Sequence, residues 1–230
     1  MNGLETKQLK IIDHVPGKRA RARFPYHDIP ATNWGRVKAT FGEEKIDYLR
    51  RLITKGRVLD LGCADGSTSR ELSEIFLDRV QIVGLDKDTQ GIEENIISPR
   101  LNEPQFIEAD GYFPPFAKNS FDVVFMMNNL FYLILKPSLR EWQLQLILTN
   151  IHFVLKPSSF FCISGALSDD GTIKKAYGIF QLDNAKKVTL WAHSDPGTFI
   201  PGPTHPQHIL DKVIQVFETI TTSPPHTPGK

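Results

Sequence analysis

A regular alternation of short apolar segments with helix-like segments is the feature of this sequence that most constrains its fold. The expected strands are residues 57–61, 80–86, 105–110, 121–127 and 160–164, and the expected helices are residues 42–55, 67–76, 89–97 and 138–153. Alternating strands and helices form parallel βαβ units, whose right-handed crossovers bring the carboxyl ends of the strands to one edge. We therefore expect an α/β fold: a doubly wound, mostly parallel sheet with helices on both faces. Residues 121–127 are almost wholly apolar, which is typical of a central strand.

The strongest local signal lies where the first expected strand meets its helix, over residues 58–67. The strand ends in Asp60, and Gly62 and Gly66 follow in the turn that opens the helix. Glycines in such a turn allow a ligand to approach the backbone closely, and the helix start offers free N–H groups and partial positive charge. The sequence therefore predicts a ligand site at the carboxyl edge of the sheet.

Two classes of ligand use a turn of this kind. A dinucleotide site requires the spacing G-x-G-x-x-G, and this chain has Ala64 and Ser67 where the second and third glycines belong. The spacing D-x-G-x-x-x-G instead resembles motif I of the class I S-adenosylmethionine-dependent methyltransferases. Ala64 stands at that family's middle glycine.

Three further segments extend the resemblance to about residues 43–165. The second expected strand ends in Asp86, and the third ends at Asp110. Residues 109–124 are similar to the small-molecule methyltransferase signature D-x-x-x-x-P-F-x-x-x-x-F-D-V-V, of the "methyltransferase domain 11" type. Residues 155–157 resemble the family's L-K-P-G-G turn, with serines in place of both glycines.

The resemblance implies a Rossmann-like methyltransferase fold and S-adenosyl-L-methionine as the cofactor. By analogy, Asp60 lies near the cofactor's ammonium, Asp86 accepts hydrogen bonds from both ribose hydroxyls, and Asp110 lies beside the adenine amino group. Cys63 is interpreted as a small neutral filler and not as a nucleophile, because no neighbouring residue supplies a base. The expected cofactor-binding residues are Asp60, Gly62, Cys63, Ala64, Asp65, Gly66, Asp86, Lys87, Asp110, Gly111 and Asn128.

The acceptor side of the site is expected after the fourth strand and in the later part of the chain. The acceptor-facing residues are predicted to be Asn129, Tyr132, Tyr177 and Trp191. Residues 128–131 lack the two prolines of the turn that often marks methyltransferases for nucleic acid bases or glutamine, which argues against those acceptors. No catalytic residue is assigned. One of His193, His205 and His208 could be a general base, although isolated surface histidines are the favoured interpretation.

The chain is expected to divide into an arm, one domain and a tail. Residues 1–41 are predicted to be a partly flexible arm with a basic run at 18–23, residues 42–223 the methyltransferase domain, and residues 224–230 a disordered tail. Within the domain, residues 166–206 are expected to be a lid over the acceptor side, although completion of the core beside the sheet is an alternative. Residues 177–182 and 188–193 suggest a hairpin, and a helix from 209 is expected to lead into a last strand at 218–222. Whether the sheet has the family's usual seventh strand is left open.

Composition limits the partners. The formal net charge of +1 gives no global attraction to nucleic acid, and no apolar run is long enough for a membrane helix. The two cysteines, the scattered histidines and the polar start of the chain favour a reduced, cytoplasmic protein without a metal site. The predicted function is methyl transfer to a small-molecule acceptor. The alternatives are a protein or RNA methyltransferase that docks through the basic run, and a non-catalytic cofactor-binding module. The sequence does not determine the oligomeric state.

Overall fold

The computed structural model describes residues 35–77, 79–87, 104–127, 141–169, 172–194 and 206–222. Several sequence-based expectations fall outside these ranges and stay predictions. They are the basic run at 18–23, the helix at 89–97, the tail at 224–230, and the site candidates Asn128, Asn129, Tyr132 and His205.

The described strands form one seven-stranded sheet in the order β3-β2-β1-β4-β5-β6-β7. Strands β1 to β5 pair in parallel, whereas β6 is antiparallel to both of its neighbours. The expectation of a doubly wound, mostly parallel sheet is thereby confirmed. The seventh strand, which the sequence left open, is present. The strands are β1 (Gly56–Leu61), β2 (Val80–Asp86), β3 (Gln105–Glu108), β4 (Phe121–Met127), β5 (Leu155–Asp169), β6 (Thr172–Leu182) and β7 (Val188–His193).

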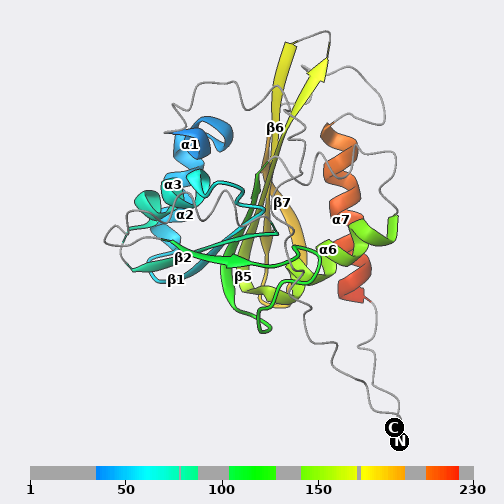
Figure 1. Cartoon of the computed structure of the whole chain (residues 1–230). Coiled ribbons are helices and arrows are strands. Elements are labelled where there is room, and N and C mark those ends of the chain that lie inside the picture. Colours follow the sequence, from blue (N-terminus) through cyan, green and yellow to red (C-terminus); the bar gives the residue numbers. More distant parts are fainter. Residues whose placement is uncertain are drawn as a thin grey trace, which may run out of the picture. The chain divides into compact units, whose positions relative to one another are not determined.

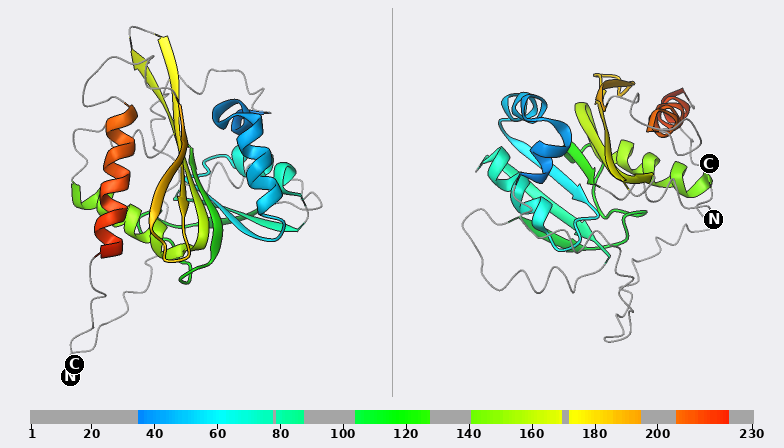
Figure 2. Two further views of the ribbon diagram at one scale, coloured as in Figure 1. Left: turned by 180° about the vertical axis from the view of Figure 1, so that it is seen from behind. Right: turned by 90° about the horizontal axis from the view of Figure 1, so that it is seen from above.

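Helices cover both faces of this sheet (Figures 1 and 2). One face carries α1 (Arg36–Phe41), α2 (Glu43–Leu52) and α3 (Ser67–Phe76), and the other carries α6 (Glu141–Val154) and α7 (Pro206–Thr222). Strand β4 contributes to both cores because its side chains alternate. Val124 and Met126 join the cluster under α6 and α7, and Val123, Phe125 and Met127 join the cluster under α1 to α3. The interpretation of residues 121–127 as a doubly covered central strand is confirmed.

Of the segment expected to be a lid, the described residues 166–169 and 172–193 extend the sheet through β5, β6 and β7, and residues 195–205 lie outside the described ranges. Strands β5 and β6 form a hairpin that pairs from Phe160↔Gln181 out to Asp169↔Thr172. Along β6, Ala176, Phe180 and Leu182 are fully buried on the α7 face, and Ile179 is fully buried on the opposite face. Because side chains alternate along β6, the sheet buries apolar residues such as Ile179 and Phe180, which the sequence analysis expected in a lid. The outer part of the hairpin rises beyond the last pair of β4 with β5, at Met127↔Ser164 (Figure 1).

The expected last strand at 218–222 is wrong, because helix α7 continues through Thr222. Its buried residues Leu210, Val213 and Phe217 recur at spacings of three and four, and partly buried Ile220 extends the same stripe. That spacing is helical, so the apolar stripe keeps facing the sheet only if the helix is not interrupted.

The start of the domain also differs from the expected boundary at residue 41. Val37 and Phe41 of α1 are fully buried, so residues 36–41 belong to the folded domain and not to the arm. Gly35, at the N-cap, supplies no side-chain cap. Instead, Oε1 of Glu71 in α3 accepts a hydrogen bond of 2.7 Å from the backbone N–H of Val37. A carboxylate at this helix start is favoured by the helix dipole, even though burial raises the pKa of Glu71.

No helix among the described residues is both long and apolar enough to cross a membrane.

Candidate functional site

The turn between β1 and α3 has an unusual backbone. Gly62, Ala64 and Gly66 have φ angles of 80°, 50° and 77°, all in the left-handed region. The backbone N–H groups of Gly62 and Cys63 both donate to the carbonyl oxygen of Leu85, at 2.7 and 3.1 Å, which ties the turn to β2. Ala64 therefore adopts a glycine-like conformation, which costs about 1–2 kcal/mol of conformational energy. The alanine at position 64 is thus accommodated within a left-handed turn.

Asp86 reaches this turn from the end of β2. Its Oδ2 atom accepts a hydrogen bond of 2.9 Å from the backbone N–H of Ala64. Strand β1 lies between β2 and β4: strands β2 and β3 are added on one side of β1, and the later strands are added on the other side. Open α/β sheets bind ligands at such a switch point, outside the carboxyl ends of the strands. The carboxylate of Asp86 and the left-handed turn thus meet where this fold places a ligand.

Asp60, in the penultimate position of β1, is buried against α3. Its side chain is 1% exposed, and its Oδ2 accepts a hydrogen bond of 2.7 Å from Oγ of Ser69 in α3. Burial raises the pKa of Asp60 to about 7, the hydrogen bond from Ser69 lowers it, and the charge of Asp86 raises it further. Asp60 therefore exists in both protonation states near neutral pH.

Cys63 and Asp65 complete the turn in different ways. Cys63 is buried, and burial raises the pKa of its thiol, so the thiolate needed for a nucleophile is disfavoured. Asp65 is exposed, and its Oδ1 accepts hydrogen bonds from the backbone N–H and the hydroxyl of Ser67, at 3.0 and 2.8 Å. This contact stabilises the first turn of α3.

Gly66 has a packing role that sequence reasoning missed. A Cβ atom at Gly66 would lie 2.6 Å from the ring of Phe106, and one at Gly84 would lie 2.7 Å from the same ring. Phe106 belongs to β3 and packs across β2 against the start of α3. The sequence analysis expected Gly66 to leave room for a ligand. In the structure, the absence of a side chain at Gly66 also leaves room for the ring of Phe106. No local sequence signal links these residues, because they lie far apart in the chain.

The loop after β3 joins the same edge. The backbone N–H of Ala109 donates to the carbonyl oxygen of Asp86 at 2.9 Å, and Oδ1 of Asp110 accepts a hydrogen bond of 2.9 Å from the backbone N–H of Tyr112. A Cβ atom at Gly111 would lie 3.3 Å from Cδ1 of Leu61, so this loop approaches the end of β1. Lys87 follows Asp86 and is exposed. Every described candidate for cofactor binding thus lies at the carboxyl edge or in the turn beside it.

The two described acceptor candidates occupy different positions. Tyr177 lies opposite Ser164, level with the last residue of β4, and its ring packs edge-on against Phe41 at 5.5 Å. Trp191 stacks on Tyr48 at 5.0 Å and also contacts Phe160, so it completes the core on the α2 side of the sheet. Of the two, Tyr177 is the one level with the carboxyl edge. His193 is exposed, and its Nδ1 contacts the carbonyl oxygen of Ser194 at 2.7 Å.

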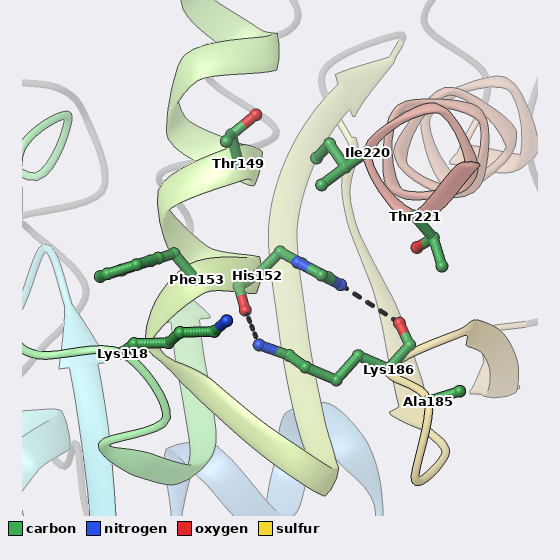
Figure 3. Close-up of a pocket in the computed structure, with 8 residues that line it drawn as sticks. All are labelled: Lys118, Thr149, His152, Phe153, Ala185, Lys186, Ile220 and Thr221. Atoms are coloured by element: carbon green, nitrogen blue, oxygen red, sulfur yellow. Dashed lines mark hydrogen bonds between the residues drawn. The ribbon is translucent and has the colours of Figure 1, made fainter. Parts of the chain in front are cut away.

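A cavity of about 300 Å³ lies at the opposite edge of the sheet (Figure 3). Lys118 precedes β4, His152 lies in the last turn of α6, and Lys186 lies in the β6–β7 turn. The ammonium of Lys186 donates to the carbonyl oxygen of His152 and to Oδ1 of Asn119, the latter at 3.2 Å. Burial and the charge of Lys118 lower the pKa of Lys186 to about 8. Lys186 therefore stabilises the carboxyl end of α6, far from the turn at Gly62.

Comparison with known proteins gives a family match over the part of the chain that builds this site. Residues 58–158 match the family model described as a methyltransferase domain. Malonyl-[acyl-carrier protein] O-methyltransferase of Legionella pneumophila is 37% identical over 84 residues, which are 36% of this chain and 28% of that protein. The chain thus matches little more than a quarter of the length of this curated relative.

Two solved structures are similar to part of this chain. The PH0226 protein of Pyrococcus horikoshii has 23% identity and a TM-score of 0.49, over 65% of this chain and 67% of that one. A SAM-dependent methyltransferase of Methanosarcina mazei has 24% identity and a TM-score of 0.41, over 48% of this chain and 52% of that one.

Proposed function

We propose, from the premise that residues 58–158 are a class I S-adenosylmethionine-dependent methyltransferase domain, that this protein transfers a methyl group to a small-molecule acceptor. The observation that carries the proposal is the contact between Asp86 and the turn. The carboxylate at the end of β2 lies 2.9 Å from the N–H of Ala64, at the switch point of the sheet.

The residues at this edge fit the chemistry of S-adenosylmethionine. Asp86 offers lone pairs and no donor, which suits a ribose diol. In this proposal the turn from Gly62 to Gly66 would hold the methionine part, next to the start of α3, where free N–H groups favour a carboxylate. Asp110, in the loop after β3, would accept a hydrogen bond from the adenine amino group. Asp60 acts from beneath the turn, where its ionised form would favour the cofactor's ammonium.

When bound, S-adenosylmethionine would supply an electrophilic methyl group, whose bond to sulfur breaks as its bond to the acceptor forms, with S-adenosylhomocysteine as the leaving group. The protein then has to align donor and acceptor and to exclude water, and such positioning can supply several kcal/mol. A general base is needed only for an acceptor that arrives protonated. We therefore assign no catalytic base to the described residues.

Three features support an acceptor that is a small molecule. Residues 109–124 follow the small-molecule signature, the sequence of residues 128–131 lacks the paired prolines, and the net charge of +1 gives no general attraction to nucleic acid. The Legionella relative is named for O-methylation of malonyl-[acyl-carrier protein], so oxygen acceptors belong in the test. Against a binding-only module, Ala64 and Ser158, with φ of 50° and 57°, keep left-handed conformations where the family has glycines.

The test combines cofactor binding with turnover. Calorimetry with S-adenosylmethionine and S-adenosylhomocysteine measures binding, and release of S-adenosylhomocysteine over a panel of carboxylic acids, phenols and amines measures transfer. We expect micromolar binding and turnover of at least one small acceptor. Binding without turnover over the whole panel would favour the binding module. Turnover only of protein or RNA, with affinity that falls steeply with salt, would favour the macromolecular alternative.

A further inference from the structure

Ser164 combines deep burial with an unsatisfied hydroxyl group. It lies in β5, where it pairs with Met127 at the end of β4 and with Tyr177 in β6. Its side chain is 1% exposed, and its Oγ has no hydrogen-bond partner among the described residues. A buried hydroxyl that finds no partner in the described part of the chain is costly to the fold, which makes Ser164 a candidate for a hydrogen bond to a ligand.

The register of the sheet fixes where Ser164 lies relative to the turn. Asp60 in β1 is in register with Phe125 in β4, which is in register with Cys162 in β5. Ser164 is two residues beyond Cys162, so it faces the same side of the sheet and is level with Gly62, which is two residues beyond Asp60. Two strand spacings separate β1 from β5, which places Ser164 about 10 Å from the turn.

This position lies on the side of the site that the cofactor leaves open in our proposal. The acid-bearing strands β1 and β2 lie on one side of the switch point, and β4 and β5 lie on the other. A cofactor held by Asp86 and the Gly62 turn therefore directs any acceptor toward the ends of β4 and β5. Ser164 lies at that end of β5, at the base of the β5–β6 hairpin that rises beyond the edge (Figure 1).

The surroundings of Ser164 indicate what it would recognise. Met127 is buried beside it, and the half-buried ring of Tyr177 packs against Phe41, so the wall is largely apolar. Nζ of Lys45 lies 5.9 Å from the centre of the Tyr177 ring and adds a positive charge nearby. A hydroxyl donor in an apolar wall, with a cation over the ring of the neighbouring Tyr177, is complementary to an oxygen that carries partial or full negative charge.

We propose that Ser164 is a specificity-determining residue, whose hydroxyl donates a hydrogen bond to a carbonyl or carboxylate oxygen of the small-molecule acceptor. This inference rests on the proposed function. Because Oγ is closed off from bulk water, an acceptor oxygen that reaches it makes this bond without competition from solvent. The bond then contributes to acceptor binding and leaves cofactor binding unchanged.

The test compares two serines of the same strand. Ser164→Ala removes the unpaired hydroxyl, and Ser159→Ala is the matched control, because Ser159 is fully buried but its Oγ donates to the carbonyl oxygen of Lys156 at 2.5 Å. For Ser164→Ala we expect a urea midpoint that is equal to or higher than that of the wild type, and unchanged affinity for S-adenosylhomocysteine. We expect the KM for a carboxylate acceptor to rise about five- to tenfold, with kcat nearly unchanged. For Ser159→Ala we expect a lower midpoint and an unchanged KM.

Two results would overturn the proposal. One is an unchanged KM in folded Ser164→Ala. The other is a fall in the urea midpoint like that of Ser159→Ala, because it would mean that the Ser164 hydroxyl is satisfied within the fold and has a structural role.

A second readout keeps this inference separate from the proposed function. If no acceptor is turned over, thermal unfolding is measured with S-adenosylhomocysteine and acetate, malonate, benzoate or benzamide as probes. Stabilisation of the wild type but not of Ser164→Ala by a probe supports an acceptor-side role even when transfer fails. Equal stabilisation of both proteins, or of neither, refutes it.

Discussion

The burial of Asp60 predicts a specific dependence of stability on pH. Burial raises its pKa from 3.8 to about 7, so the folded protein holds this proton more tightly than the unfolded chain does. Between these two values the folded state binds more protons, and stability therefore falls as pH rises. With 1.36 kcal/mol per pKa unit, the contribution of Asp60 decreases by about 2–3 kcal/mol between pH 5 and pH 8.

The perturbation that isolates this effect is Asp60→Asn. The amide has nearly the same shape, accepts the hydrogen bond from Ser69 and carries no charge at any pH. Other titrating groups contribute equally to both proteins, so the informative quantity is the difference in free energy of unfolding between variant and wild type. We expect this difference to shift in favour of the variant by about 2–3 kcal/mol from pH 5 to pH 8.

The assay is urea unfolding of both proteins without cofactor at pH 5, 6, 7 and 8, with the m-value checked for constancy. Ser69→Ala serves as a second variant, because the hydrogen bond from Ser69 lowers the pKa of Asp60 and its loss should extend the fall in stability to higher pH. A difference between Asp60→Asn and wild type that does not change with pH would refute the reasoning. It would mean that water or a neighbouring cation already solvates this carboxylate.

Three further predictions concern the turn and the base of the sheet. Asp86→Ala should weaken S-adenosylmethionine binding at least tenfold by calorimetry, since each charge-assisted hydrogen bond contributes about 1.5–3 kcal/mol. Asp86→Asn still accepts the hydrogen bond from Ala64 and should lose less affinity. Equal affinity of folded Asp86→Ala and wild type would contradict this prediction. Gly62→Val should abolish cofactor binding and destabilise the fold by about 1–2 kcal/mol, because valine is strained at a φ of 80°, and cofactor binding of normal strength would show that the turn is not the site. Gly56→Ala should destabilise the fold by about 2 kcal/mol or more in urea unfolding, because its Cβ would lie 2.1 Å from Oδ2 of Asp122, and an unchanged midpoint would mean that the carboxylate moves freely.

The sequence alone determined the features that depend on local pattern. Hydrophobic spacing located β1, β2, β4 and α3, and the acid and glycines of residues 60–66 located the turn at the carboxyl edge. These predictions were possible because strand and helix periodicities are carried by neighbouring residues. A glycine-containing strand-to-helix turn likewise has its chemistry within a few positions.

Local pattern was a poorer guide to the late part of the chain. The apolar residues of β6 were consistent both with a lid and with a buried strand, and only pairing with β5 distinguishes them. Similarly, residues 218–222 had β-propensity but belong to α7, because the stripe through Val213 and Phe217 faces the sheet. In both cases burial in the tertiary structure, and not the local preference of the residues, determined the secondary structure.

The tertiary structure alone decided the contacts that join residues distant in the chain. Glu71 caps a helix 34 positions earlier, Phe106 occupies the space above Gly66, and Asp60 becomes buried beneath α3. Ser164 looks like an ordinary strand residue in the sequence, and only the register with β4 and β6 gives it a place at the edge and an unsatisfied hydroxyl. Burial, desolvation and hydrogen-bond satisfaction are properties of packed neighbours, so one-dimensional spacing cannot specify them.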